Sequence, residues 1–368
     1  MQNGASPNPS VKRIAIIPGD GIGPEVTREG VRLLEWYRAR GFPFELWELD
    51  LGAHRWLRDG TGLPSELFAE IRDSAHAVLV GALGDPRIPG HEHARAILFG
   101  LRHGLDLYAN VRPVRALSDR LVPLAGRTRR DVDWVVFREN TEGLYAGIGG
   151  RLREGTPHEV AVEEDINTRL GVERIVRAAF AFAARTGRPL CLADKSNALR
   201  HGHDLWQRVF ALVRGEYPSV LAEHRYIDAL CYDLVREPAR FGVVVTNNLF
   251  GDIVSDLCAA LGGGLGLAPS ANLHPGGGVP GLFEPVHGSA PTLAGKDAAN
   301  PIAMLRTVGL LLEELGYPEE RTRIEHASAV ALEARECTAD SGGSLGTRAA
   351  AEAVFVRLEE PLAAGSQS

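Results

Sequence analysis

The stretch that most constrains the fold is residues 241–261, where a short apolar run is followed by a polar turn and a helical pattern. Residues 241–246 are rich in valine and predict a buried β-strand. Beyond the turn, Ile253, Leu257 and Leu261 recur at helical spacing and predict the buried face of a helix. A buried strand that leads into a helix is typical of an α/β protein with a largely parallel sheet.

Two carboxylates, Asp252 and Asp256, lie one turn apart on this predicted helix. Two like charges at this spacing destabilise a helix, so removing either one should stabilise the chain in the absence of a cation. A solvated acidic face is the ordinary interpretation of such a pair. The pair follows the carboxyl end of a buried strand, however, where open α/β sheets bind their ligands. Because carboxylate oxygens suit hard divalent cations, we expect a metal site here.

Composition excludes several other classes of protein. A length of 368 residues suits two lobes, and a net charge of −7 without basic clusters argues against nucleic acid as a partner. No run of about 18 apolar residues exists, so no membrane span is expected. Residues 1–10 are expected to form a disordered tail and not a signal peptide. Four cysteines without C-x-x-C spacing predict buried thiols of a reducing cytoplasm, namely Cys191, Cys231, Cys258 and Cys337.

The N-terminal part alternates predicted strands and helices. A strand pattern at residues 11–17 ends in the glycine-rich turn 18–24, and a helix follows. The spacing G-x-G-x-G-P differs from the G-x-G-x-x-G of a dinucleotide-binding loop, which argues against a Rossmann phosphate site. The glycines still predict a tight turn where the backbone closely approaches another group.

Three arginines lie beside elements that could converge. Arg102 ends a predicted helix that also carries Arg95 and Phe99 on the same face, Arg112 precedes a proline, and Arg138 follows the predicted strand 133–137. Arginines gathered near one point, without acidic partners nearby, would bind carboxylates in a bidentate manner. Scattered surface ion pairs are an equally good interpretation of the spacing alone.

Other polar residues also follow extended segments. Lys195 ends a predicted strand, where either a proton donor or a snorkelling surface lysine would lie, and Asp228 follows another. Residues 147–164 predict a protruding hairpin arm. Residues 284–291 predict a turn that opens a helix-like segment, and the exposed amides of such a turn suit a phosphate.

Four motifs together resemble those of the β-decarboxylating dehydrogenases, the isocitrate/3-isopropylmalate dehydrogenase superfamily. They are IPGDGIGPE at 17–25, RENTEGLY at 138–145, NLFGDIVSD at 248–256 and EPVHGSAP at 284–291. The resemblance extends from about residue 13 to 358. It implies a non-Rossmann, two-lobe α/β fold with a discontinuous large cofactor-binding domain, residues 11–106 and 263–368. Residues 107–262 would form a smaller domain for substrate, metal and dimerisation, with an arm at 147–164.

The resemblance also implies residue roles in a homodimer with shared active sites. Arg102, Arg112 and Arg138 would bind the substrate carboxylates. Asp252 and Asp256 would bind Mg²⁺ or Mn²⁺, together with Asp228 of the second subunit. Tyr145 and Lys195 would handle protons, with Lys195 reaching across the dimer. The nicotinamide cofactor site would be lined by Glu284, His287, Gly288, Ser289, Ala290, Thr292 and Asn300.

The implied reaction is the oxidative decarboxylation of a malate-type 2-hydroxy diacid to a 2-oxo acid and CO₂. A metal chelated by the hydroxyl and its carboxylate lowers the pKa of the hydroxyl and later stabilises the enolate. A nearby lysine can take the hydroxyl proton, and a tyrosine can protonate the enolate carbon. Arginines orient the carboxylate that departs.

Two pairs of segments are more similar to tartrate/D-malate dehydrogenases, namely 149–156 with 168–175 and 269–275 with 282–285. Segment 340–347 is more similar to 3-isopropylmalate dehydrogenases. Leu98 and Phe99 allow an apolar pocket, but Arg95 replaces the glutamate usual in isopropylmalate enzymes. An arginine facing an apolar substituent would be buried and unpaired, at substantial cost. We therefore rank D-malate and tartrate first and 3-isopropylmalate second, with isocitrate and homoisocitrate as further alternatives.

Thr292 bears on the choice between NAD and NADP, and two other classes of protein could carry the same polar residues. Thr292 replaces the aspartate that binds the adenosine ribose in NAD-using members, so NAD is expected over NADP with weakened discrimination. A regulatory subunit without activity is a rival, but Tyr145, Lys195 and the metal carboxylates are intact. A metal-dependent aldolase or hydrolase is another, but it would not explain residues 284–291 with Asn300.

Overall fold

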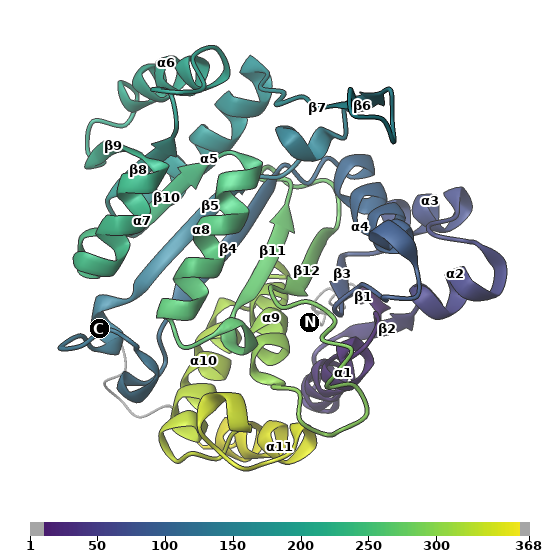
Figure 1. Ribbon diagram of the computed structural model, residues 1–368. Coiled ribbons are helices and arrows are strands. Elements are labelled where there is room, and N and C mark those ends of the chain that lie inside the picture. Colours follow the sequence, from purple (N-terminus) through teal and green to yellow (C-terminus); the bar gives the residue numbers. More distant parts are fainter. Residues whose placement is uncertain (1–10, 361–368) are drawn as a thin grey trace, which may run out of the picture. The chain divides into compact units, whose positions relative to one another are not determined.

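The computed structural model describes residues 11–360 (Figure 1). The chain divides into two compact units. Unit 1 comprises Met1–Gly100 and Gly278–Ser368, and unit 2 comprises Leu101–Gly277. The expected smaller domain, 107–262, falls inside unit 2. The expected disordered tail, residues 1–10, lies outside the described residues.

Unit 1 is built on parallel strands that pair in the order β2-β1-β3-β12. Its elements are β1 (Lys12–Ile17), α1 (Gly23–Ala39), β2 (Phe44–Glu48), α2 (Ala53–Asp59), α3 (Ser65–Ser74), β3 (Ala77–Val80), β12 (Gly281–Pro285), α9 (Ile302–Glu314), α10 (Pro318–Glu333) and α11 (Thr347–Leu358). Helix α4 (Glu92–Gly104) begins in unit 1 and ends in unit 2.

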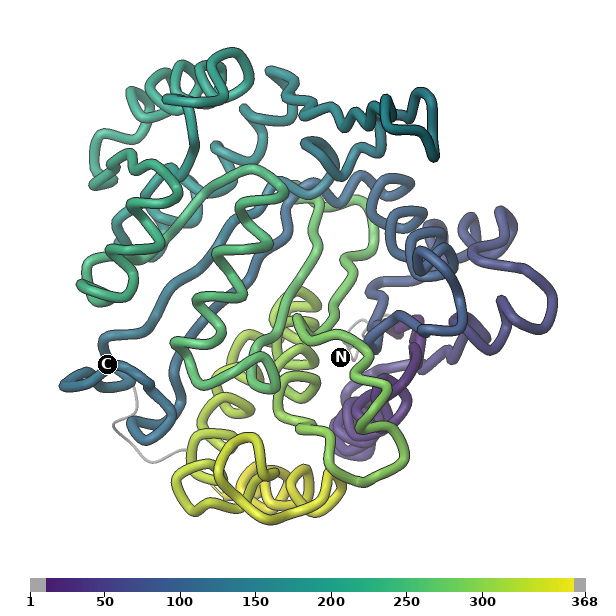
Figure 2. The backbone as a smooth tube through the Cα atoms, in the orientation of Figure 1, coloured from purple at the N-terminus to yellow at the C-terminus, as the bar shows by residue number. Residues whose placement is uncertain are grey.

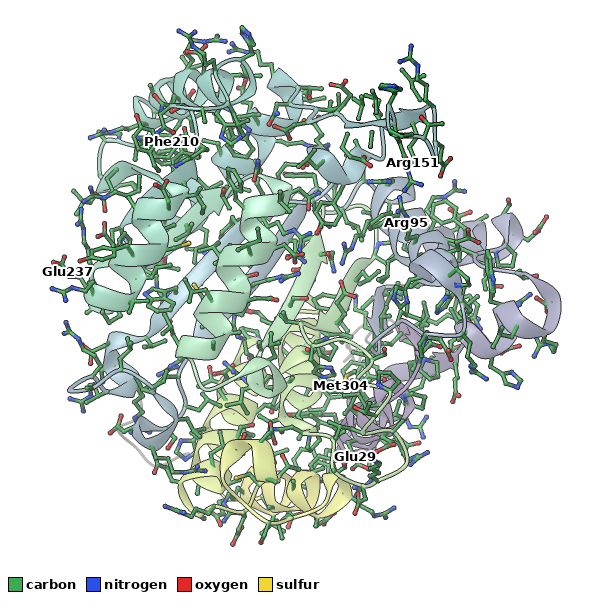
Figure 3. The ribbon with its side chains drawn as sticks, viewed as in Figure 1. Glu29, Arg95, Arg151, Phe210, Glu237 and Met304 are labelled. Carbon is green, nitrogen blue, oxygen red and sulfur yellow. The ribbon has the colours of Figure 1, made fainter. Side chains whose placement is uncertain are left out.

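Helix α9 is buried along almost its whole length, because α1, α10 and β12 pack around it. A side-chain carbon added at Gly30 of α1 would come within 2.9 Å of the Cγ of Met304, which Figure 3 labels. The glycine therefore allows α1 and α9 to approach closely. Between α9 and α10, the buried Arg306 guanidinium lies 2.9 Å from the buried Glu325 carboxylate.

Unit 2 combines antiparallel and parallel pairing in the order β11-β4-β5-β10-β8-β9. Strand β4 pairs antiparallel with both of its neighbours, β11 and β5, and strands β5, β10, β8 and β9 run parallel. Its elements are β4 (Ala109–Arg115), β5 (Asp133–Glu139), β6 (Gly149–Leu152), β7 (Val160–Glu163), α5 (Arg169–Thr186), β8 (Leu190–Asp194), α6 (Gly202–Arg214), β9 (Ala222–Tyr226), α7 (Ile227–Arg236), β10 (Val243–Thr246), α8 (Asn248–Leu261) and β11 (Pro269–Leu273).

Helices cover both faces of this part of the sheet. Along β10, Val243 and Val245 belong to the apolar cluster formed with α5 and α6, whereas Val244 belongs to the cluster formed with α7 and α8. Because successive side chains of a strand point to opposite faces, a strand covered on both sides is a continuous apolar run. This confirms the buried strand expected at 241–246.

The buried face of α8 differs from the expected one. Val254, Cys258 and Leu261 are buried, whereas Ile253 is 56% exposed and Leu257 is only partly buried. Two adjacent apolar stripes run along this helix, and spacing alone does not say which one faces the sheet. The stripe of Ile253 and Leu257 is left at the surface of the single chain.

The expected arm is an antiparallel hairpin of β6 and β7, joined through residues 153–159 (Figure 2). The expected helix-like segment after residue 291 is wrong, because 291–295 form turns and α9 begins only at Ile302. None of the four cysteines, all within residues 11–360, forms a disulfide. Within the same residues no helix is long and apolar enough to cross a membrane.

Replacing Arg306 with methionine should lower the free energy of unfolding by about 3 kcal/mol, because the buried Glu325 carboxylate then lacks the arginine charge. The double variant Arg306→Met/Glu325→Leu should recover most of this loss. Urea unfolding measures both. The control is Arg321→Met, which removes a more exposed ion pair between the same two helices, with Glu313, and should change stability by less than about 1 kcal/mol. Equal effects of Arg306→Met and Arg321→Met would contradict the account.

Candidate active site

The carboxylate of Asp252 is the centre of a charge cluster in unit 2. Arg138, at the end of β5 and buried, donates a hydrogen bond to Asp252 Oδ1. Arg112, on β4, places its Nη2 3.2 Å from the same oxygen. The charge of Arg102 is near enough to lower the pKa of Asp252 as well. Strands β4 and β5 are neighbours and α8 packs on them, so residues far apart in sequence meet here.

The structure therefore brings the three predicted arginines together, but it corrects one expectation. They do not lack an acidic partner, since Asp252 pairs with two of them. Spacing could not show this, because the carboxylate lies more than 100 residues along the chain from both arginines. Only the pairing of β5 with β10, which leads into α8, reveals the contact.

Polar neighbours hold the two buried guanidinium groups in place. Arg138 Nε donates to Asn248 Oδ1 at 2.9 Å, and Arg112 Nε donates to Asn110 Oδ1 at 2.7 Å. Arg112 Nη1 donates to Ser255 Oγ at 2.8 Å. Asn110, Asn248 and Ser255 were not expected as site residues. Asn248 and Ser255 lie within the 248–256 motif, which was a signal that could have identified them.

A glycine makes the close approach of α8 possible. A side-chain carbon added at Gly251 would lie 2.6 Å from both Cβ and Cγ of Arg138. Any larger residue would therefore displace the arginine or the helix. The helix begins cleanly at this point, because the Asn247 side chain caps it by accepting the Phe250 N–H at 2.9 Å.

Tyr145 also contacts the cluster. It lies on a short helical turn, Leu144–Ala146, and its hydroxyl donates to Asp252 Oδ2 at 3.0 Å. Its ring centre is 5.1 Å from the guanidinium carbon of Arg138. Burial, with the Asp252 charge, raises the pKa of Tyr145 above its ordinary value. The phenol is therefore protonated at neutral pH and can serve as a proton donor.

The two carboxylates of α8 differ electrostatically. Burial raises the pKa of Asp252, but the charges of Arg138 and Arg112 outweigh this effect and the net pKa is lowered. Burial also raises the pKa of Asp256, and there the net change stays upward, with Arg112 Nη1 3.6 Å away. Asp252 is thus held ionised, whereas the charge on Asp256 is disfavoured in the absence of a cation.

The third predicted metal ligand does not join this pair within one chain. Asp228, in the first turn of α7, accepts a hydrogen bond from Lys195 Nζ at 2.5 Å, and this bond is the main cause that lowers the pKa of Asp228. Among residues 11–360, no group of three or more histidine, cysteine, aspartate or glutamate side chains is placed to hold a metal ion.

In unit 1, the glycine-rich turn packs against the loop that follows β12. Ile22 N–H donates to the Ser289 carbonyl at 2.8 Å, and a side-chain carbon at Gly21 would lie 2.1 Å from that oxygen. This confirms the expected close approach of backbone. Asp20, which was not expected as a functional residue, is buried and accepts hydrogen bonds from the Ala53 and Gly84 amides at 2.7 and 2.8 Å.

The predicted cofactor residues lie along one segment of unit 1. His287 Nε2 is buried and makes no hydrogen bond, so it offers a polar atom to a ligand. Asn300 is engaged within the chain, because its amide donates to Asp340 and Ser341 at 3.0 and 2.9 Å. Thr292 is exposed. The other predicted members, which are Glu284, Gly288, Ser289 and Ala290, belong to or follow β12, and Ala290 has a left-handed φ of 37°.

The predicted specificity residues lie on α4. Leu98 and Phe99 are partly buried, and Arg95 is exposed with its guanidinium carbon 5.5 Å from the Phe99 ring centre (Arg95 is labelled in Figure 3). Arg95 is therefore hydrated in the single chain.

Comparison with known proteins identifies the class. The family model of isocitrate/isopropylmalate dehydrogenase matches residues 13–354, and the chain belongs to this family. Solved relatives share the α/β fold. Isocitrate dehydrogenase from Methylococcus capsulatus is 37% identical with a TM-score of 0.86, over 95% of this chain and 100% of that one. A β-decarboxylating dehydrogenase from Thermococcus kodakarensis is 36% identical with a TM-score of 0.75, over 95% and 96%.

Curated relatives narrow the class to a decarboxylating dehydrogenase of this family. The 3-isopropylmalate dehydrogenase of Thermobifida fusca is 47% identical over 350 residues, 95% of this chain and 98% of the relative. That of Frankia casuarinae is 47% identical over 346 residues, 92% and 99%. These relatives do not support the expected nearness to tartrate/D-malate dehydrogenases. The segments that suggested it are short, whereas these matches extend over almost the whole chain.

The ion pairs of Asp252 and Asp256 with the arginines change the expectation that removing either carboxylate stabilises the chain without a cation. The lowered pKa of Asp252 means that its ionised form stabilises the fold above the pKa of the unfolded chain, and that this stability is lost as pH falls through the folded-state pKa. Asp252→Asn should therefore destabilise the chain at pH 7, by about 1 kcal/mol given partial exposure of the carboxylate. The deficit should disappear in acid.

Asp256→Asn is the matched comparison. Its raised pKa means that the ionised form opposes folding at neutral pH, so the amide should raise the melting temperature slightly. Melting curves recorded in EDTA between pH 3 and pH 8 measure both effects. If both variants were stabilised to the same degree, simple repulsion within the pair would be the better description.

Proposed function

We propose that the enzyme catalyses the metal- and NAD-dependent oxidative decarboxylation of a 3-substituted malate, with 3-isopropylmalate as the first candidate. Enzymes of this family act on small 2-hydroxy acids and typically use NAD(P) with Mg²⁺ or Mn²⁺. The observation that carries the proposal is the cluster in which Arg112, Arg138 and Tyr145 converge on Asp252. The arginines could bind substrate carboxylates, the Tyr145 phenol could donate a proton, and the Asp252 carboxylate could be an oxygen ligand for a metal ion.

The residues present fit a hard divalent cation. Asp252 and Asp256 supply carboxylate oxygens from successive turns of α8, and Mg²⁺ commonly takes only one or two protein carboxylates, with water and substrate oxygens completing its shell. When bound, such a cation would polarise the substrate hydroxyl and carboxylate. A cation would also relieve the unfavourable charge on Asp256, whose pKa is raised in its absence.

The segment around β12 fits a nicotinamide cofactor. The buried His287 Nε2 lacks a hydrogen-bond partner, and a buried polar atom of this kind calls for a ligand contact. The backbone of Ser289 is fixed by the glycine-rich turn through Ile22. This segment would hold the cofactor, while the residues of unit 2 would bind the acid.

The chain's own groups divide the remaining chemistry. Arg102, Arg112 and Arg138 would bind and orient the two carboxylates of the diacid. Tyr145, whose raised pKa keeps it protonated, would deliver a proton to the enolate carbon after CO₂ leaves. Lys195 would accept the hydroxyl proton.

We further propose that the functional unit is a dimer with shared sites. Lys195 and Asp228 pair with each other and do not join the Asp252 cluster of their own chain, so they would act in the site of a second copy. Helices α7 and α8 expose large apolar side chains that such a copy would cover, with Tyr232, Val235 and Ile253 being 64%, 41% and 56% exposed.

The names of the relatives and the apolar residues of α4 support 3-isopropylmalate as the first candidate substrate. Relatives that match more than nine-tenths of the chain are named 3-isopropylmalate dehydrogenases. Leu98 and Phe99 would offer apolar surface to a branched substituent, and Arg95 on the same helix is exposed. D-malate and tartrate, which have smaller substituents, are the second candidates.

A substrate panel tests the proposal. With Mn²⁺ and NAD⁺, 3-isopropylmalate should give NADH and CO₂ with a kcat/KM at least about tenfold above D-malate, tartrate, isocitrate and homoisocitrate, since burial of a branched alkyl group contributes about 1–3 kcal/mol. Arg95→Leu should change this preference little. Excess chelator should abolish turnover of every acid.

Two results would decide against parts of the proposal. A preference for D-malate or tartrate over 3-isopropylmalate would restore the ranking suggested by the short segments. Full activity in chelator, or in Asp252→Asn, would remove the metal assignment altogether.

Thr292 leads to a separate prediction about the cofactor. Because it is neutral, the repulsion that an acidic residue exerts on a 2′-phosphate is absent, and NAD⁺ should be preferred to NADP⁺ only weakly. Thr292→Asp should tighten NAD⁺ binding by about 1 kcal/mol, the scale of one hydrogen bond. Leu293→Asp adds the same charge one residue further along and serves as the control. A wild-type preference for NADP⁺ above about tenfold, which corresponds to 1.4 kcal/mol, would overturn this prediction.

A further inference from the structure

A buried histidine lies beneath the turn that carries Lys195. The turn follows β8, and His203 lies in the first turn of α6, with 1% of its surface exposed. His203 Nδ1 accepts the Lys195 backbone N–H at 2.9 Å. None of the roles assigned above uses this side chain.

The other ring nitrogen faces the beginning of α8. His203 Nε2 lies 3.3 Å from the side-chain nitrogen of Asn247. The Asn247 amide cannot be reversed, because its oxygen accepts the Phe250 N–H as the helix cap. The Phe250 ring also packs near the imidazole, with centroids 5.4 Å apart. His203 therefore contacts both the Lys195 turn and the cap of α8.

The nearest atom to each ring nitrogen of His203 thus belongs to an N–H donor, and the Asp165 carboxylate lies further from Nε2, at 3.9 Å. A neutral imidazole has one lone pair to offer, and an imidazolium has none. The shorter contact assigns the lone pair to Nδ1, so the Lys195 N–H is satisfied. The Nε2–H then lies on the side of Asn247 and the Asp165 carboxylate, whereas a protonated Nδ1 would direct an N–H group at the Lys195 N–H. Burial likewise lowers the pKa of His203, so the ring is neutral at physiological pH.

We propose that His203 is a positioning residue that fixes the Lys195 turn relative to the beginning of α8. This inference rests on the proposed function, in which Lys195 handles a proton and α8 carries the metal carboxylates. In a dimer with shared sites, Lys195 serves one site and the α8 of the same chain serves the other. His203 then connects the two active centres through a single side chain.

Neighbouring bonds explain why one lost contact matters. The Lys195 carbonyl accepts from the Ala198 and Leu199 amides at 2.9 and 2.8 Å, and Asp194 Oδ1 accepts the Ser196 N–H at 2.9 Å. The turn is thus held by bonds within itself and by a bond to the last residue of β8. The bond to His203 is the contact that sets the Lys195 backbone against the cap of α8.

The test compares three variants of the full-length protein. His203→Asn keeps an acceptor in the place of Nδ1, because both atoms are bonded to Cγ, whereas His203→Leu has a similar size and no acceptor. His201→Leu is the control, since His201 is exposed and makes no capping bond. The first measurement is hydrogen exchange of the Lys195 amide. We expect exchange about a hundredfold faster in His203→Leu, and within about threefold of wild type in the other two.

The second measurement is steady-state kinetics with the best acid of the panel. His203→Leu should lower kcat about a hundredfold, the effect of a misplacement of the order of 1 Å, while KM stays within about threefold. His203→Asn and His201→Leu should retain most activity. In a Lys195→Ala background, His203→Leu should cause no further loss of the residual rate, because it acts through Lys195.

Each outcome bears on one claim. Unchanged kcat in His203→Leu, equal losses in His203→Asn and His203→Leu, or a full additional loss in the Lys195→Ala background would each overturn the positioning role. If His203→Leu fails to fold, the exchange rate and kcat of His203→Asn decide, and loss of either would overturn it. A wild-type enzyme that turns over no acid of the panel would instead overturn the proposed function. Even then, an unchanged exchange rate of the Lys195 amide in His203→Leu would overturn the positioning role of His203.

Discussion

The ion pairs of the Asp252 carboxylate with Arg112 and Arg138 are the interaction on which the arrangement of the candidate site in unit 2 depends. Arg138 and Arg112 are buried cations on adjacent strands, and two such charges can be buried together only with a counterion between them. Helix α8 supplies that counterion from a third element. The constraint explains why Gly251 lies where any side chain would strike Arg138, and why Asn247 caps the helix at this point.

The charges that stabilise the single chain are also those proposed to bind its ligands. A substrate carboxylate would compete with Asp252 for Arg112 and Arg138, and a divalent cation would compete with the arginines for Asp252. Binding of the acid would therefore free the carboxylate that the cation needs, and binding of the cation would free the arginines that the acid needs. Such coupling between two ligands is reciprocal by thermodynamic necessity. The raised pKa of Asp256 adds to it, because a cation would remove the cause that disfavours its ionised form.

Much of this arrangement could be predicted from the sequence, and the failures have physical causes. The run of valines before Asn247 predicts β10, since a strand covered on both faces must be apolar throughout. The paired carboxylates and the three arginines were found from motif and position. The ion pairs between these carboxylates and arginines were not predicted, because contacts between neighbouring strands depend on the order of strands in the sheet. The buried face of α8 was misassigned, since two apolar stripes share the helix. Asn110 and His203 act through contacts that leave no local pattern, whereas Asp20 lies within the 17–25 motif but its hydrogen bonds to Ala53 and Gly84 depend on the fold.

The most direct test of this account is the affinity of Mn²⁺, measured by electron paramagnetic resonance, with and without the preferred diacid and in the absence of NAD. The account predicts that the acid tightens Mn²⁺ binding by at least about tenfold, within the usual range of coupling between sites. It also predicts that Asp252→Asn removes this enhancement. Equal Mn²⁺ affinity with and without the acid, or tight binding that survives in Asp252→Asn, would contradict the central role given to this carboxylate.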